Sequence, residues 1–169
     1  MTNKKSYKRN YSVKRVGGHL HKVIPIVDEA GKVLHYAIKP LMVELRARDL
    51  MQIVVGSVLL AIPVGFTEEV WRLGQELTNA SIIWFALFSL TFIAVFVYSN
   101  LYHNHLKGYE FEYIKRVLAV YIISLTVVGI FMTLIGKCPW GLDTAVALKR
   151  IIIVAFPASM SATLSDMVK

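Results

Sequence analysis

The chain is poor in acidic residues and in cysteine, and it lacks the short motifs of common enzymes. Eleven Asp and Glu stand against nineteen Lys and Arg among 169 residues. The one cysteine, Cys138, excludes an intrachain disulfide. A glycine-rich phosphate loop, Gly-x-Ser-x-Gly and His-Glu-x-x-His are all missing from the sequence, so we expect no enzyme and no cofactor.

Apolar residues, in contrast, are abundant and clustered. They make up 56% of the chain, and the mean hydropathy is +0.54, which is high for a soluble domain. A spanning helix needs about 20 apolar residues, and several windows approach this length. The sequence therefore predicts an all-α membrane protein, a bundle of four transmembrane helices. The predicted spans are about 50–73, 80–102, 115–136 and 145–166.

The fourth window is the shortest, because its uninterrupted apolar part runs only from Ile151 to Leu164. It reaches spanning length if the helix begins near Thr144 and accepts Lys149 and Arg150 at its entrance. Long basic side chains can extend to the headgroups from such a position. If the segment is only re-entrant, the carboxyl end changes side.

The basic residues are concentrated before the first span. Eleven of the nineteen Lys and Arg precede Leu50, a bias that keeps a terminus in the cytoplasm. We therefore expect a multi-pass protein of the plasma membrane with its N-terminus inside. The basic arm can also contact anionic lipid headgroups. No recognisable nucleic-acid module surrounds these charges, so we do not expect nucleic acid as a partner.

Three regions follow from this pattern. Residues 1–18 are predicted to be a basic disordered arm, residues 19–39 a small cytoplasmic β-hairpin, and residues 40–169 the transmembrane domain. In the hairpin, two β-prone runs, 21–27 and 33–38, flank a turn. An isolated hairpin is marginal in water, so we expect it to pack on the membrane domain or to pair with another subunit of a homo-oligomer.

Two prolines interrupt apolar segments, one in each half of the chain. Pro63 frees the carbonyl of Leu59, and Thr67, one turn later, can satisfy part of that defect. Pro157 lies nine residues before Asp166. Broken apolar helices in both halves are typical of transporter sites, although kinks that only improve packing explain them as well.

An acidic pair, Glu68 and Glu69, follows the first apolar run. We expect the first helix to continue to Gly74, which places both carboxylates in its last turns near the outer interface. Glu68 has the i,i+4 spacing for an ion pair with Arg72. Glu69 is then the stronger candidate for an ion site, with Glu68, Thr67 and Asp166 as further candidates.

The fourth segment is rich in small residues at helical spacing. Such residues let helix backbones approach closely, which favours this helix as the bundle centre or a subunit contact. The candidate packing residues are Ala155, Ala158, Ser159 and Ala162.

The histidine pair at 103 and 105 has no neighbouring Cys or carboxylate ligand. We interpret it as an interfacial polar cluster, and a metal site stays unassigned.

The stretch Leu59–Gly74 resembles the opening motif of an uncharacterised bacterial and archaeal family of integral membrane proteins. The resemblance covers about residues 50–166, leaves the arm and the hairpin outside, and implies no activity. A second similar stretch is Phe156–Ser159. The motif positions are Pro63, Thr67, Glu69, Trp71, Leu73 and Gly74.

Two functional hypotheses follow. The leading one is passage or coupling of a small cation or proton across the membrane, with Glu69 and Glu68 as attracting or gating carboxylates. The second is a scaffold, sensor or accessory subunit without transport, whose basic arm and hairpin recruit a partner.

Overall fold

The computed structural model describes residues 12–16, 19–28, 33–40, 44–103 and 109–168. The chain divides into two compact units, Met1–Glu44 and Leu45–Lys169.

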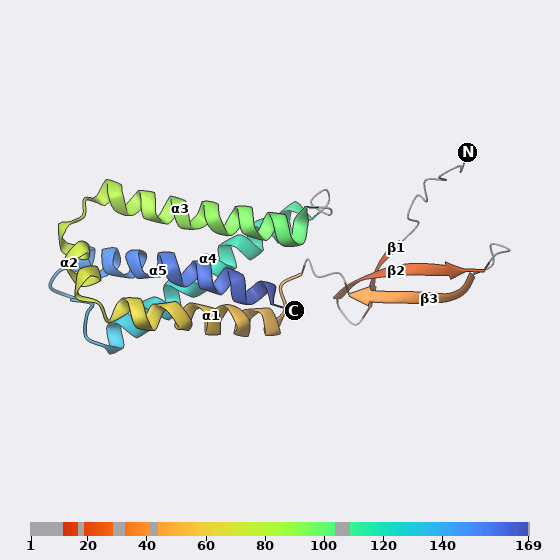
Figure 1. Ribbon diagram of the computed structural model, residues 1–169, viewed down its shortest axis with the longest axis horizontal. Helices are drawn as coiled ribbons and strands as arrows, with labels where there is room; N and C mark the ends of the chain where they lie inside the picture. The colour runs from red at the N-terminus through yellow and green to blue at the C-terminus, as the bar shows by residue number, and fades with distance from the viewer. Residues whose placement is uncertain (1–11, 17–18, 29–32, 41–43, 104–108, 169) are drawn as a thin grey trace, which may run out of the picture. The chain divides into compact units, whose positions relative to one another are not determined.

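The first unit holds a three-stranded antiparallel sheet in the order β1-β2-β3 (Figure 1). The strands are β1 (Ser12–Val16), β2 (His19–Val27) and β3 (Val33–Pro40). β2 and β3 pair as the predicted hairpin. β1 lies where we expected a disordered arm, because adjacent cationic residues obscure its strand pattern and pairing with β2 supplies its hydrogen bonds. The rest of that arm, residues 1–11, lies outside the described residues.

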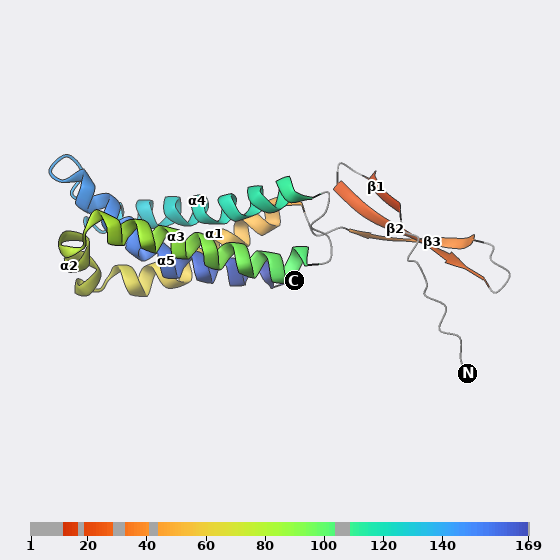
Figure 2. The same ribbon diagram turned by 90° about the horizontal axis from the view of Figure 1, so that it is seen from above.

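In the second unit, the described residues include four helices long and apolar enough to cross a membrane, which confirms the predicted fold class. Figures 1 and 2 show the four running side by side. They are α1 (Ala47–Gly65), α3 (Asn79–Val97), α4 (Glu110–Leu134) and α5 (Thr144–Met167). A π-helical turn, η1 (Tyr98–Tyr102), prolongs α3, and the short helix α2 (Glu68–Glu76) lies between α1 and α3 in the chain. α5 is a continuous helix of 24 residues, so its length suffices to span.

The first predicted helix is in fact two helices. We expected one helix to about residue 73, but α1 ends at Gly65 and the backbone of Thr67 is extended, with φ −84° and ψ 137°. The Thr67 hydroxyl donates to the Val64 carbonyl at 2.7 Å, which satisfies an acceptor left at the end of α1. α2 then begins with two carboxylates in its first turn, where the helix dipole favours negative charge. Gly74 lies inside α2 and does not end the helix.

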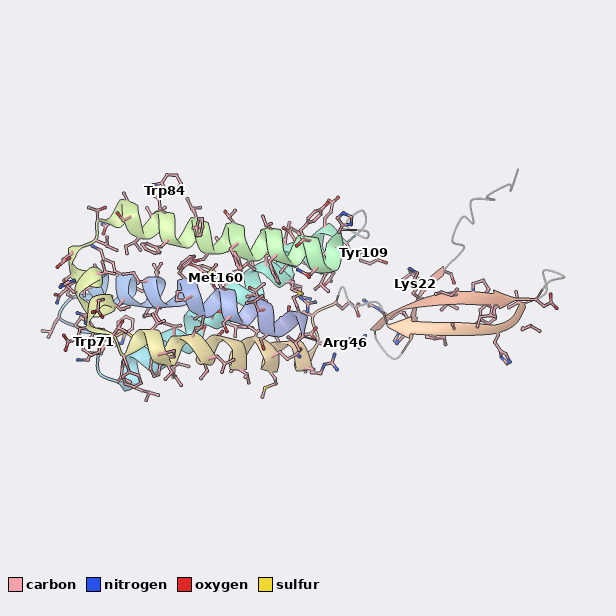
Figure 3. All side chains as sticks on the ribbon, viewed as in Figure 1. Lys22, Arg46, Trp71, Trp84, Tyr109 and Met160 are labelled. Atoms are coloured by element: carbon pink, nitrogen blue, oxygen red, sulfur yellow. The ribbon has the colours of Figure 1, made fainter. Side chains whose placement is uncertain are left out.

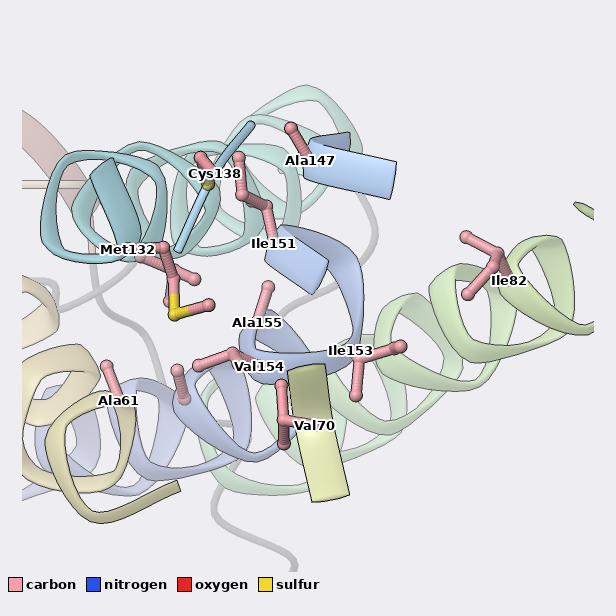
Figure 4. Packing of buried hydrophobic residues seen from close by; sticks show 12 residues of the cluster. Ala61, Val70, Ile82, Met132, Cys138, Ala147, Ile151, Ile153, Val154 and Ala155 are labelled. Carbon is pink, nitrogen blue, oxygen red and sulfur yellow. The ribbon is translucent and has the colours of Figure 1, made fainter. Parts of the chain in front are cut away.

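α5 packs against α1, α2, α3 and α4. It approaches α1 closely at Gly56, where an added Cβ would lie 2.6 Å from the Cβ of Ser165 and 2.8 Å from the Cα of Ala162. Small side chains on both helices therefore permit close backbone contact. Figure 4 shows the neighbouring apolar cluster, in which Val154 and Ala155 of α5 meet residues from the other helices.

Large apolar side chains also cover the outside of the bundle. Figure 3 shows Trp84 projecting from α3 away from the other helices, and this side chain is 71% exposed. Exposed apolar area of this extent suits contact with lipid tails.

Candidate functional site

A cluster of three ionisable side chains lies at one end of the bundle. α1 and α4 begin at this end and α5 finishes there (Figure 1). The side chains of Asp49, Arg116 and Asp166 meet there. The Arg116 guanidinium donates from Nε to Asp166 Oδ2 and from Nη2 to Asp166 Oδ1, both at 2.8 Å. Nη2 also donates to Asp49 Oδ2 at 3.2 Å. All three residues are fully buried.

This ionic cluster has the geometry of a strong contact. A bidentate Arg–carboxylate pair combines charge with two directed hydrogen bonds. Because desolvating these groups is costly, the pair adds little net stability, but removing one partner leaves a buried charge uncompensated. The cluster therefore fixes how α1, α4 and α5 lie against one another.

Further polar contacts surround the ionic cluster. The backbone N–H of Arg46 donates to Asp49 Oδ2 at 3.2 Å. Gln52 Nε2 donates to the Val168 carbonyl at 2.8 Å, which joins the start of α1 to the residue after α5. The buried ring of Tyr102 packs edge-on against Tyr113, with centroids 5.3 Å apart. Polar groups and aromatic rings therefore meet at this end of the bundle, although among the described residues Nε and Nη2 of Arg46 and Oε1 of Gln52 are buried without a hydrogen-bond partner.

Sequence reasoning named Asp166 as an ion-site candidate but missed Asp49 and Arg116. Both lie beside an apolar window of the sequence, where solvated side chains are the ordinary expectation. A usable signal was present, since Asp49, Arg116 and Asp166 each lie at a helix end that the four-span topology places on one side. The topology thus places Asp166 beside the cation of Arg116 and away from the other acidic candidates, Glu68 and Glu69.

Glu68 and Glu69 lie at the opposite end of the bundle, in the first turn of α2 (Figure 1). Both side chains are exposed. The ion pair expected between Glu68 and Arg72 is replaced by one between Arg72 and Glu76, with Nε and Oε1 3.6 Å apart. The structure therefore separates the acidic pair from Asp166 by the length of the bundle.

The neighbouring residues of the α1–α2 segment have structural roles. The Trp71 indole N–H donates to the Gly65 carbonyl at 2.9 Å, which caps the end of α1. The Lys137 ammonium lies 3.6 Å from the centroid of the Trp71 ring, a cation–π contact. At Gly74 an added Cβ would overlap the Cγ of Arg150, so this position favours glycine.

Lys149 and Arg150 also differ from expectation. We expected them to extend to headgroups, but each binds backbone carbonyls within the protein. Arg150 donates from Nε to the Trp71 carbonyl at 3.1 Å and from Nη1 to the Lys137 carbonyl at 2.6 Å. Lys149 Nζ donates to the Leu77 carbonyl at 2.7 Å. These cations stabilise carbonyls of α2 and of the loop before α5, including the residue just past the end of α2.

The two prolines lie within continuous helices, Pro63 in α1 and Pro157 in α5. The four predicted packing residues are all buried in α5, and they are Ala155, Ala158, Ser159 and Ala162. Ser159 Oγ donates to the carbonyl of Phe156 at 2.9 Å, within its own helix. One hydroxyl pair, Ser57 and Ser124, joins α1 to α4 at 3.0 Å. Small side chains and short polar contacts therefore lie in the interior beside larger buried residues such as Ile53 and Met132.

In the described residues, few side chains are placed to bind a metal ion or another ligand. In the described part of the chain, no group of three or more His, Cys, Asp and Glu side chains could hold a metal ion. Of the histidine pair, His103 is described and exposed, whereas His105 lies outside the described residues. A groove of about 550 Å³ opens on the α3 side, and its lining is mostly aromatic and aliphatic. Such a lining offers few ligands to an ion.

Comparison with known proteins gives one match. A family described as "Putative integral membrane protein (DUF2391)" matches residues 29–168. The match starts earlier than the region of about 50–166 that the resemblance covers, and it takes in β3. No curated protein and no solved structure matches the chain.

Proposed function

Because the chain belongs to this family of integral membrane proteins, we propose that it acts as a membrane-embedded scaffold, sensor or accessory subunit without transport. Its spanning bundle holds the basic N-terminal unit at the membrane, and that unit recruits a partner.

The observation that carries this proposal is the position of Asp166. An ion site needs a carboxylate that faces a path open to the ion. Asp166 is fully buried and bonded through both oxygens to Arg116. Its charge is used to hold helices together.

The opposite end of the bundle supports the same proposal. Glu68 and Glu69 are exposed in the first turn of α2, where negative charge favours the helix. Thr67 and Trp71 use their polar atoms to bind carbonyls at the end of α1. Each of these residues therefore has a structural reason for its position.

The N-terminal unit provides the part that can recruit a partner. Residues 1–44 carry nine Lys and Arg against three Asp and Glu, so this unit holds a net charge of +6 out of the chain's +8. A surface with this charge attracts acidic partners over distances of about 10 Å at moderate salt.

Proteoliposome flux measurements test the proposal. We expect purified protein to give no uptake of H⁺, Na⁺ or K⁺ above that of empty liposomes. Deletion of residues 2–44 should leave the bundle folded and abolish association with the partner in native membranes. Ion flux that Glu69→Gln abolishes, with folding and oligomeric state unchanged, would overturn the proposal.

Passage or coupling of a small cation is the second candidate. The ionic cluster favours it, because ionisable side chains within spanning segments often mark ion or proton pathways. In that case Glu69 and Glu68 attract the cation at one end, while Asp166 and Asp49 take part at the other. Flux lost in both Glu69→Gln and Asp166→Asn, with the thermal unfolding of each variant unchanged, would support this candidate.

Location and assembly belong to the same proposal. The concentration of Lys and Arg before the first span supports insertion in the plasma membrane with the N-terminus in the cytoplasm. A homo-oligomer would cover part of the exposed apolar surface, and light scattering of the purified protein would measure its size.

A further inference from the structure

The N-terminal sheet has an apolar face. Leu34, Tyr36 and Ile38 alternate along β3 and therefore point to the same side of the sheet. They are 58%, 63% and 55% exposed. In the register with β2, Tyr36 lies opposite Pro25 and Ile38 lies opposite Val23, which extends the apolar face to the neighbouring strand.

The other face of the sheet carries cationic side chains among apolar ones. Arg15, Lys22 and His35 lie on it, and so do Val13, Ile24 and Ile26. Antiparallel sheets commonly pack their apolar face against other groups and leave the polar face in water. The described residues thus leave Leu34, Tyr36 and Ile38 open, whereas Val23 on the same face is only 8% exposed.

The net charge of the N-terminal unit and the length of the linker to α1 indicate what covers the apolar face. The unit has a net charge of +6, which complements an anionic surface and repels a second copy. Six residues separate Pro40 from Ala47, the first residue of α1, and six extended residues span at most about 20 Å. The headgroups around the spanning bundle are therefore always within reach, at a high effective concentration.

We propose that the apolar face of the sheet docks on the anionic leaflet that surrounds the bundle, with Leu34, Tyr36 and Ile38 inserted at the headgroup boundary. Tyrosine is enriched at this depth because its ring is apolar and its hydroxyl is polar. A cation close to an anionic surface adds about 1 kcal/mol of attraction, which applies to Lys14 on the same face and not to Arg15 and Lys22 on the opposite one. Three side chains are too few for a stable protein interface, which buries about 800 Å² per partner. The inference goes beyond the proposed function and holds whether or not the bundle transports an ion.

The test uses the full chain with Cys138→Ser and a single new thiol at Leu34→Cys, labelled with an environment-sensitive fluorophore. One copy is placed in each nanodisc, made from phosphatidylcholine alone or from phosphatidylcholine with phosphatidylglycerol. Brominated acyl chains then report contact with lipid by quenching. The matched control is His35→Cys, the next residue along β3, which lies on the opposite face.

We expect the label at residue 34 to shift to the blue and to be quenched in anionic discs. Quenching should be weaker in phosphatidylcholine and should fall when salt is raised from about 0.1 M to about 1 M, since screening then acts within about 3 Å. The label at residue 35 should stay unquenched. Ile38→Cys provides a second site on the apolar face if Leu34→Cys disturbs β3.

Three results would overturn the inference. The labels at 34 and 38 could stay unquenched in every lipid, or the labels at 34 and 35 could be quenched equally. A blue shift without quenching would mean that protein, and not lipid, covers the face. If that blue shift appears only in discs that hold two copies of the chain, the covering protein is a second copy.

Discussion

At the scale of single residues, the same chemical group takes two different roles in this protein. Asp166 is fully buried and bonded to Arg116, whereas Glu68 is exposed in the first turn of α2. A sequence pattern cannot separate these roles, because both residues appear as a carboxylate near an apolar segment. The difference lies in which residues the topology brings near each one.

Asp166→Ala should therefore destabilise the bundle by about 3 kcal/mol, since it leaves the Arg116 charge buried with a partner missing. Thermal unfolding in detergent, followed by circular dichroism, measures this loss. Glu68→Ala is the control and should change stability by about 0.5 kcal/mol or less. Equal effects of the two substitutions would contradict the structural role of the ionic cluster.

Cys138 allows a prediction on pH. It lies between α4 and α5, and burial raises the pKa of its thiol, although a hydrogen bond with Thr133 and the charge of Arg150 oppose this shift. The thiolate is the reactive form, so less of it is present at neutral pH than for a free thiol. Iodoacetamide should react slowly in the folded protein, with a rate that rises at higher pH than for a free cysteine. In sodium dodecyl sulfate the rate should return to the free value, and a folded protein that reacts as fast would refute the burial argument.

At the scale of elements, helix length and type could be predicted, but interruptions could not. Apolar windows of about 20 residues gave the four spans, because the bilayer sets that length. The break between α1 and α2 depends on Thr67 and Trp71 binding carbonyls at the end of α1. Likewise β1 depends on its pairing with β2. The ionic cluster depends on three helix ends that lie close together. Such contacts between distant residues are not visible in local periodicity.

The contact between α1 and α5 gives a test at this scale. Gly56→Ala places a Cβ against the backbone of Ala162, so it should destabilise the bundle by about 1 to 3 kcal/mol. Gly129→Ala is a matched control in α4, because its Cβ would meet only Ile151 Cδ1 at 3.7 Å. That change should stabilise the helix by about 0.5 to 1 kcal/mol. Thermal unfolding of both variants measures the difference, and similar midpoints would argue against close packing at Gly56.

At the scale of the whole molecule, the distribution of charge predicts how the protein lies in the membrane. In a Cys138→Ser background, single thiols at Ser12→Cys and Glu76→Cys mark the sheet and the end of α2, and both positions are exposed. A membrane-impermeant maleimide added to intact cells should label residue 76 and not residue 12. Both should react after lysis. Labelling of residue 12 in intact cells would reverse the proposed orientation.

The ionic cluster also bears on how the chain is made. Arg116 is in the third span and Asp166 is in the fourth, so the guanidinium enters the bilayer before its bidentate partner has been inserted. Until α5 is inserted, Asp49 is the one carboxylate of this ionic cluster that can pair with Arg116 of α4. A bundle without α5 therefore contains an incompletely paired arginine, and the insertion of α5 completes the pairing.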